Sequence, residues 1–291
     1  MRLVTITDLD QDKATKGLLI ERAMQLGKWY GDFKATDTGA YNYEVDVGGE
    51  RHRAPGVHAS EMKCKRMMVY SIMDYERRPV SAAQGDTNMR MRFASGHAHH
   101  AMIQNDFHRM CERFNGALTF QDEVRIDPSL GGAAELWGMH SSCDGEFTFW
   151  HDQAPYLRIG VEIKTASHLE FDKLVKPHED YSKQTCLYQK ALDLPLMWIF
   201  YYNKSNSNWT NSEPPYLFQF DDHLWTTELE PRIADAHVHA RNQVLPTREE
   251  GRYCRWCPFA WDCQPPSLLA TMRGHGPSRT AHRPGALRVM R

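Results

Sequence analysis

The pattern of apolar and polar residues in the first 115 positions is typical of helices. We expect helices from Gln11 to about Trp29, over Met62–Arg77, and from about Ser95 to Asn115. Ser60 can cap the second helix, because its hydroxyl can accept a hydrogen bond from a backbone N–H of the first turn. Pro55-Gly56 breaks the polar connector in front of that helix. The first part of the chain is therefore predicted to be mainly helical.

The pattern changes after residue 117, where short runs rich in aromatic and β-branched residues are separated by turn residues. We expect strands over Leu118–Ile126, Gly145–Trp150, Leu157–Thr165 and Leu196–Tyr202, and a helix over about Glu179–Leu192. The order is three strands, a helix and a fourth strand. It predicts an α/β core with helices before and after it.

Composition narrows the class of protein only a little. The 291 residues can bury a sizeable core, and 41% apolar and 25% charged residues are ordinary for a soluble globular protein. No apolar run is long enough to span a bilayer, and residues 1–13 lack the features of a signal peptide. We therefore expect a cytoplasmic protein with reduced thiols and no membrane contact.

The net charge of −2 does not indicate a nucleic-acid-binding protein, so any DNA contact must depend on local basic clusters. Lys63, Lys65 and Arg66 form one such cluster, with Arg77 and Arg78 further along the chain. These residues are candidates for DNA binding, and an ordinary solvated face is the alternative.

Glu162 and Lys164 are the residues that suggest catalysis. They lie two positions apart on a predicted strand, so their side chains project from one face while Ile163 points into the core. Asp144 begins the preceding strand, and a hairpin would bring it beside Glu162. The two carboxylates and the Ile163 carbonyl offer hard oxygen ligands for Mg²⁺ or Mn²⁺, which can support phosphodiester hydrolysis. A surface strand that happens to carry Glu and Lys is the alternative.

Two pairs of residues flank this centre at helical spacing. Gly96 and His100 lie four apart on the upstream helix, where the imidazole could complete a metal shell, although a helix histidine is more often structural. Gln184 and Tyr188 also lie four apart, on one face of the helix that follows. They could orient water or contact a DNA phosphate, and a polar helix flank is the alternative.

The seven cysteines are unevenly placed. Cys254, Cys257 and Cys263 lie within ten residues of one another, and such a cluster in a reduced compartment suggests a metal site before a disulfide. The other cysteines, apart from Cys64, are expected to be small buried residues, with Cys143 facing the core: Cys111, Cys143 and Cys186.

The ordered motifs resemble the PD-(D/E)XK nuclease superfamily. They are Gly96/His100, Asp144, Glu162-Ile163-Lys164 and Gln184/Tyr188. The resemblance is to the RecB-like branch, which includes the CRISPR-associated iron–sulfur exonucleases of the Cas-four type, the AddB nuclease domain and many phage exonucleases. Within this branch, the sequence is most similar to the phage members.

The resemblance implies a restriction-endonuclease-like α/β core, a central mixed sheet flanked by helices, with a helical region stapled by an iron–sulfur cluster. It covers residues 56–264. Residues 1–55 would then be an N-terminal helical extension. Residues 265–291, which contain five arginines and no acidic residue, are interpreted as a flexible basic tail, with a passive end as the alternative.

The resemblance also implies a role for each residue. The metal ligands would be His100, Asp144, Glu162 and the carbonyl of Ile163. Lys164 would position the attacking water and stabilise negative charge, and Gln184 and Tyr188 would support the site and the DNA. Cys64 would join Cys254, Cys257 and Cys263 around a 4Fe–4S cluster, with Zn²⁺ as the alternative.

The function implied is a Mg²⁺- or Mn²⁺-dependent DNA exonuclease that acts on single-stranded ends, with 5′-to-3′ polarity favoured by analogy. Replication, recombination or CRISPR-adaptation proteins would be its partners, in a bacterium or a phage-infected bacterial host. A flap-trimming or structure-specific endonuclease and a non-catalytic DNA-binding adaptor are the alternatives.

Overall fold

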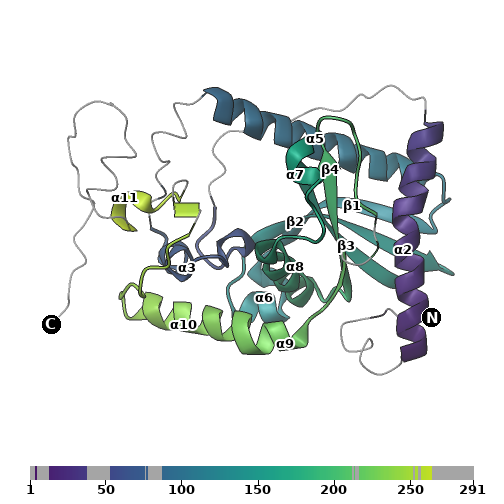
Figure 1. Ribbon diagram of the computed structural model, residues 1–291. Coiled ribbons are helices and arrows are strands. Elements are labelled where there is room, and N and C mark those ends of the chain that lie inside the picture. Colours follow the sequence, from purple (N-terminus) through teal and green to yellow (C-terminus); the bar gives the residue numbers. More distant parts are fainter. Residues whose placement is uncertain are drawn as a thin grey trace.

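The computed structural model describes residues 4, 13–37, 53–75, 77, 87–211, 213, 216–251, 253–254 and 257–263. The predicted basic tail, residues 265–291, lies outside the described residues, as does Arg78. Within the described ranges, no helix combines the length and the apolar character that crossing a membrane requires. Figure 1 shows a central sheet with helices on both sides.

The sheet has five strands in the order β1-β2-β3-β4-β5. They are β1 (Leu118–Ile126), β2 (Ser141–His151), β3 (Ala154–Ala166), β4 (Leu196–Asn203) and β5 (Leu217–Gln219). Only β3 and β4 run parallel to each other, and the other neighbours are antiparallel, so the sheet is mixed. The parallel pair needs a crossover, which helix α8 (Glu179–Leu192) supplies.

Two long helices cover one face of the sheet: α2 (Lys13–Thr36) and α5 (Thr87–Glu112). The other face packs against α3 (Lys65–Ile72), α6 (Gly132–Leu136), α8 and α10 (Glu230–Arg241). Short elements complete the described chain: η1 (Ala59–Glu61), η2 (Pro128–Leu130), α7 (His168–Phe171), α9 (Asp222–Leu224), the π-helical turn η3 (Trp225–Leu229) and α11 (Ala260–Cys263). The fold is therefore α/β, as predicted.

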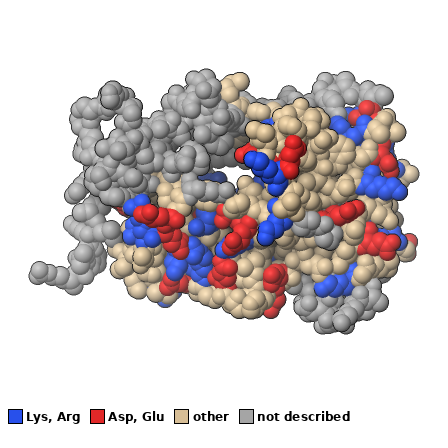
Figure 2. Space-filling model, in the orientation of Figure 1, with Lys and Arg blue, Asp and Glu red and all other residues tan. Residues whose placement is uncertain are grey.

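Charged side chains are intermingled on the surface. Figure 2 shows Lys and Arg next to Asp and Glu over the region where Figure 1 places α10. Some of these charges form ion pairs: Lys65 Nζ lies 2.5 Å from Asp235 Oδ2, and Arg232 Nη2 lies 2.5 Å from Glu249 Oε2. The described part of this face therefore does not present a broad surface of one sign.

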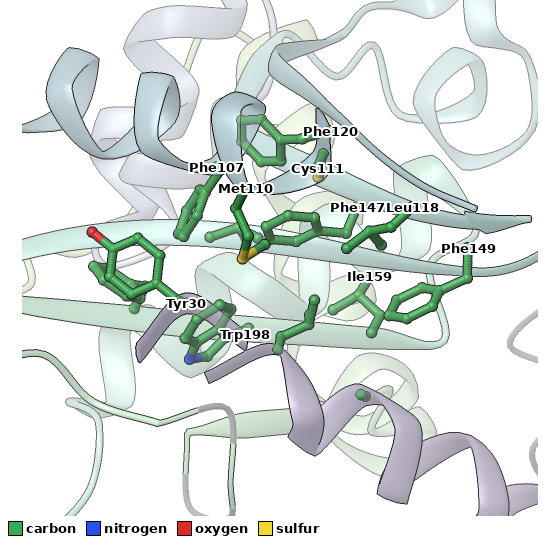
Figure 3. Packing of buried hydrophobic residues seen from close by; sticks show 14 of the residues in the cluster. Tyr30, Phe107, Met110, Cys111, Leu118, Phe120, Phe147, Phe149, Ile159 and Trp198 are labelled. Atoms are coloured by element: carbon green, nitrogen blue, oxygen red, sulfur yellow. The ribbon is translucent and has the colours of Figure 1, made fainter. Parts of the chain in front are cut away.

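Aromatic rings form the core between the sheet and helices α2 and α5. Phe107 of α5 lies edge-on to Phe120 and Phe147, with ring centroids 5.2 Å and 5.1 Å away, and 5.2 Å from Tyr30 of α2. Figure 3 shows these side chains gathered between the helices and the strands. Edge-to-face contacts at such distances add to the stability gained by burial. They fix α5, and with it His100, against the sheet.

Several predicted bounds need correction. Strand β1 and helix α8 have the predicted bounds, but β2 begins at Ser141, so Asp144 lies inside the strand rather than at its start. Helix α3 ends at Ile72 rather than Arg77, because Asp74 has a φ of 52° and cannot continue a right-handed helix. Helix α2 continues to Thr36 and shares the aromatic core with the sheet.

Candidate active site

Strands β2 and β3 separate at the residues predicted to be catalytic. The hairpin turn consists of Asp152 and Gln153, which both have positive φ (50° and 62°), as the common two-residue turns require. The strand pairing ends at Gly145 and Val161. The next residue of each strand is a predicted carboxylate, Asp144 or Glu162, so the predicted hairpin does bring the two side by side.

Asp144 occupies the gap between the separating strands. Its Oδ2 accepts a hydrogen bond from the backbone N–H of Ile163 at 2.6 Å, which replaces a ladder bond beyond the paired region. The Ile163 side chain is fully buried in the core, as its place between Glu162 and Lys164 predicted. Asp144 is therefore held in one orientation by the backbone of the strand that carries Glu162 and Lys164.

The buried side chains of β1 switch from one face of the sheet to the other at the position opposite Asp144. Glu123 has a left-handed φ of 49° and has no register partner on β2, although its neighbours Asp122 and Val124 do. Phe120 packs on the α2–α5 side of the sheet, whereas Val124 packs on the α8 side. Glu123 therefore interrupts the β1–β2 pairing opposite Asp144, and the pairing resumes at Val124 and Cys143.

Glu162 and Lys164 form a close ion pair on the same side of β3. Lys164 Nζ donates a hydrogen bond to Glu162 Oε1 and also lies 4.4 Å from the centroid of the Tyr181 ring. Such a cation–π contact adds to the attraction between ammonium and carboxylate. The predicted juxtaposition of Glu162 and Lys164 is present.

The two carboxylates have opposite pKa shifts. Burial and the negative charge of Asp144 raise the pKa of Glu162 to about 7, against the lowering effect of Lys164. Burial also tends to raise the pKa of Asp144, but His100, Lys164 and the Ile163 N–H outweigh it and hold that pKa below its ordinary value. Two neighbouring carboxylates of this kind favour one proton or one cation between them.

One carboxylate oxygen of Glu162 is available to bind a cation. The residue is 2% exposed, and its Oε2 accepts no hydrogen bond from any described residue. A buried carboxylate oxygen without a donor is costly, and a divalent ion would satisfy it. As the described side chains lie, however, no group of three or more His, Cys, Asp or Glu residues is arranged to hold a metal ion. The chemistry of the donors fits Mg²⁺ or Mn²⁺, but Glu162 faces Lys164 in this arrangement.

His100 lies beside Asp144. Its Nδ1 is 3.6 Å from Asp144 Oδ1, and its side chain is 29% exposed. Burial tends to lower the pKa of His100, but the hydrogen bond and charge of Asp144 raise it above its ordinary value. Gly96 is less informative, because a side chain there would meet no atom within 4 Å. The structure thus brings His100 to the carboxylates and gives no steric reason for the glycine.

Gln184 and Tyr188 form a pair behind the carboxylates. Gln184 Nε2 donates to the Tyr188 hydroxyl at 2.6 Å, across one turn of α8. Burial, together with the negative charges of Glu162 and Asp144, raises the pKa of Tyr188 well above its ordinary value, so the hydroxyl stays protonated. Because Tyr188 is only 2% exposed, it is better placed to support the site than to meet DNA at the surface.

Two polar residues of the site were not predicted. Gln104 Nε2 donates to the Asp144 carbonyl at 2.8 Å and lies 3.3 Å from Glu123 Oε1. Gln104 is one helical turn beyond His100, and this spacing of four could have indicated it. Glu123 could not have been found in that way, because its role depends on an unusual backbone angle.

The predicted DNA-binding cluster is occupied by internal contacts. Lys65 pairs with Asp235 at 2.5 Å, Arg66 Nε donates to the Pro246 carbonyl at 2.6 Å, and Lys63 Nζ lies 4.1 Å from the Tyr253 ring centroid. These contacts join the start of α3 to α10 and to the segment after it. Their described role is structural, and DNA binding by these residues stays a prediction.

The structure brings Cys64 from a distant part of the chain to the three C-terminal cysteines. Cys64 and Cys263 pack against the cluster that contains buried Cys257, and Cys257 is within electrostatic range of Cys254. Burial raises the pKa of Cys257 to about 12, so its thiol would stay protonated without a nearby cation. All seven cysteines are among the described residues, and none of them forms a disulfide. Cys111, Cys143 and Cys186 are buried, as predicted.

Comparisons with known proteins define no family for the chain. The sequence matches no protein-family model, and a comparison with curated proteins found no match. Among solved structures, the chain is similar to SSO0001 (13% identity, 87% of this chain and 98% of that chain, TM-score 0.42). It is also similar to an alkaline exonuclease, LHK-Exo, from Laribacter hongkongensis (16% identity, 66% and 90%, TM-score 0.40). LHK-Exo in complex with dAMP gives 15% identity, the same coverage and a TM-score of 0.37. Likenesses this weak do not by themselves indicate a function.

Proposed function

We propose that this protein is a metal-dependent deoxyribonuclease of the PD-(D/E)XK superfamily, in its RecB-like branch. One observation carries the proposal: Asp144 and Glu162 lie side by side where β2 and β3 separate, and Glu162 keeps a buried oxygen without a described donor. Lys164 lies on β3 with Glu162 and is paired with it. Two carboxylates and a lysine in this arrangement suit the hydrolysis of a phosphodiester bond.

Asp144, Glu162, His100 and the Ile163 carbonyl would hold Mg²⁺ or Mn²⁺. The bound ion would lower the pKa of a water molecule and offset negative charge on the scissile phosphate. Glu162 can bind the ion only if it gives up part of its contact with Lys164. The orphaned oxygen of Glu162 and the orientation of Asp144 by the Ile163 N–H both favour that exchange.

Lys164 acts as a cation rather than as a base. Burial tends to lower its pKa, but the charges of Glu162 and Asp144 raise it above the ordinary lysine value, so the ammonium is retained at neutral pH. Held over the Tyr181 ring, it can orient the attacking water and stabilise charge on the phosphate. Gln184, Tyr188 and Gln104 keep the carboxylates and their backbone in place.

Single-stranded DNA ends are the substrate we propose, with 5′-to-3′ polarity, in phage DNA replication or recombination or a related process. Support for this part of the proposal comes from the order of the motifs between His100 and Tyr188 and from their resemblance to phage exonucleases. The partners would be replication, recombination or CRISPR-adaptation proteins, and the compartment would be the bacterial cytoplasm.

We also propose that Cys64, Cys254, Cys257 and Cys263 bind a 4Fe–4S cluster, with Zn²⁺ as the alternative. The approach of Cys64 to the C-terminal cysteines supports this, because a cluster there would close a loop of nearly two hundred residues. Anaerobically purified protein should be brown and absorb near about 400 nm if iron and sulfide are present. Colourless protein with one equivalent of zinc would contradict the iron–sulfur assignment.

End-labelled linear DNA, single- and double-stranded, tests the nuclease proposal directly. Cleavage should require Mg²⁺ or Mn²⁺, stop with EDTA, and be lost in Lys164→Ala. Circular single-stranded DNA should stay intact, since its cleavage would indicate an endonuclease. Binding of DNA without any cleavage would indicate a non-catalytic adaptor instead.

A further inference from the structure

A second charged site lies next to the proposed active site, on the segment that precedes α3. This segment, Arg53–Glu61, is anchored to the chain just before β2. Val57 N donates to the Gly138 carbonyl at 2.9 Å, and His140 N donates to the Val57 carbonyl at 2.8 Å. The anchored segment therefore lies beside the residues that lead into β2, the strand that carries Asp144.

Gly56 makes this close approach possible. Its φ is 146°, and a Cβ atom there would lie 2.4 Å from the Gly138 carbonyl oxygen. Any other residue would clash with the backbone and be strained in its own conformation. The position of the Arg53–Glu61 segment is thus set by backbone contacts rather than by flexible side chains.

The segment also packs against the helix that supports the active site. Val57 and Ala59 belong to the same buried cluster as Tyr188 of α8. Tyr188 in turn is close enough to Glu162 and Asp144 for their charges to raise its pKa. Arg53 lies within electrostatic range of Tyr188. Tyr188 is therefore within electrostatic range of both the carboxylates and Arg53, and a strand of DNA could extend from one to the other.

The positive charge of Arg53 is not paired with a described carboxylate. It is exposed, and Nη1 donates a hydrogen bond to the neutral Ser60 hydroxyl at 3.1 Å. No described carboxylate lies within ion-pair distance of it. The nearby carboxylate of Glu61 is fully buried and is already paired with Arg77, which also contacts Ser71. Arg53 and Arg77 thus lie within electrostatic range of each other, and Glu61 is the one carboxylate of the described residues that influences Arg53.

From this geometry we infer that Arg53 binds a phosphate of the DNA strand other than the one being hydrolysed. The guanidinium offers several donors to a phosphate, and Ser60 holds it in place at the edge of the site. Arg77 and Glu61 act behind it as positioning residues. This inference rests on the proposed nuclease function and adds a binding residue that contributes to substrate affinity rather than to bond cleavage.

Arg53 differs from the basic cluster predicted from the sequence in what it contacts. Lys65 and Arg66 are engaged by Asp235 and by the Pro246 carbonyl, whereas Arg53 contacts only a neutral hydroxyl among the described residues. A guanidinium without a carboxylate partner loses less by turning to a phosphate. Arg53 is therefore the better candidate for a DNA contact.

The test measures DNA binding apart from cleavage. Fluorescence anisotropy of a labelled single-stranded oligonucleotide, with the protein in EDTA, gives the dissociation constant at a series of salt concentrations. For Arg53→Gln we expect about tenfold weaker binding and a salt-dependence slope lower by about 0.7, because one phosphate contact is lost. Arg53→Lys should keep most of the slope. The control is Arg22→Gln on α2, an exposed arginine next to Trp150 at the far end of β2, roughly 20 Å along the strand from Asp144.

Turnover supplies the second readout. With Mn²⁺, Arg53→Gln should raise KM about tenfold and leave kcat within about twofold, since the contact is made equally in the ground state and the transition state. Oligonucleotides with and without a 5′ phosphate identify the group: an equal loss indicates an internal phosphate, and a larger loss with the phosphorylated one indicates the terminal phosphate.

Two results would overturn the inference in different ways. If the unmodified protein cleaves DNA and Arg53→Gln binds with unchanged affinity and slope, Arg53 is not a phosphate contact, but the proposed function stands. If the unmodified protein neither binds nor cleaves DNA, both proposals fail together.

Discussion

Two buried carboxylates, Glu162 of β3 and Asp106 of α5, have similar surroundings and, we propose, different roles. Glu162 is 2% exposed and Asp106 is 0% exposed, and each is paired with a lysine. Each also keeps one oxygen that accepts no hydrogen bond from a described residue. In both cases burial is the largest influence on the pKa and raises it above the ordinary value. Burial and a lysine partner therefore do not distinguish a catalytic carboxylate from a structural one.

The difference lies in the other charged neighbours. Lys34 lies 3.0 Å from Asp106 and the Tyr30 hydroxyl 2.9 Å from it, and Arg109 adds a further positive charge. Those groups stabilise the ionised carboxylate and join α2 to α5. Glu162 instead has Asp144 beside it, whose charge disfavours ionisation unless a cation is present. The second carboxylate is the feature that makes Glu162 a candidate metal ligand.

The largest effect should come from neutralising each carboxylate in turn and measuring DNA cleavage. We expect Glu162→Gln to reduce kcat about a thousandfold or more, since a metal ligand is lost. Asp106→Asn should keep kcat within a few fold when rates are expressed per folded molecule. Equal losses in both variants would remove the distinction between them.

The raised pKa of Glu162 should appear as a pH dependence of stability in metal-free protein. Glu162 has a pKa of about 7 in the folded state and an ordinary value of 4.5, so the folded state binds the proton more tightly. Wild-type stability should therefore fall, relative to Glu162→Gln, as pH rises from 4.5 to 7, by up to about 3 kcal/mol. Urea unfolding in EDTA across this range measures the difference, and a difference that is constant with pH would contradict the assignment.

Asp106 should matter more than Glu162 for stability without metal. Removing its charge leaves Lys34 without that ionised partner and weakens the contact between α2 and α5. We expect Asp106→Asn to lower the free energy of unfolding by about 2 kcal/mol, less than for a fully buried pair because Lys34 is 24% exposed. At pH 5, Glu162→Gln should change it by less than about 1 kcal/mol. A larger loss of unfolding free energy in Glu162→Gln than in Asp106→Asn, measured by urea unfolding, would contradict this expectation.

The matched tyrosines should give the smallest effects. Tyr30 donates to Asp106, and Tyr188 lies beside Glu162 and accepts from Gln184. Tyr30→Phe should cost about 1 kcal/mol of stability and leave kcat unchanged, because it removes one structural hydrogen bond. Tyr188→Phe should lower kcat roughly tenfold by loosening the support of the carboxylates. Thermal unfolding and single-turnover cleavage should be measured on both variants. A lower kcat in Tyr30→Phe together with an unchanged kcat in Tyr188→Phe would contradict the two roles.

The sequence was sufficient for features that depend on local periodicity. The alternation of side chains along a strand predicted that Glu162 and Lys164 share a face, and the expected hairpin predicted that Asp144 meets Glu162. The helical spacing of four predicted the contact between Gln184 and Tyr188. Each of these needs only one or two neighbouring elements.

Features that depend on distant contacts could not be predicted. The sequence pattern did not indicate that Asp106 is buried and paired, because its burial arises from the packing of α2 against α5. The position of Arg53 depends on the approach of Gly56 to Gly138, far along the chain. Lys65 looked available for DNA because its partner, Asp235, lies on a helix that was not predicted.

Direct measurement of Mn²⁺ binding tests the central claim, that Asp144 and Glu162 together hold a catalytic metal. Electron paramagnetic resonance at pH 8 reports free Mn²⁺ in mixtures with the unmodified protein, Asp144→Asn, Glu162→Gln and Asp106→Asn. We predict that the unmodified protein and Asp106→Asn remove Mn²⁺ from solution, and that Asp144→Asn and Glu162→Gln bind it at least about tenfold more weakly. Equal binding by all four proteins would contradict the assignment of these two carboxylates.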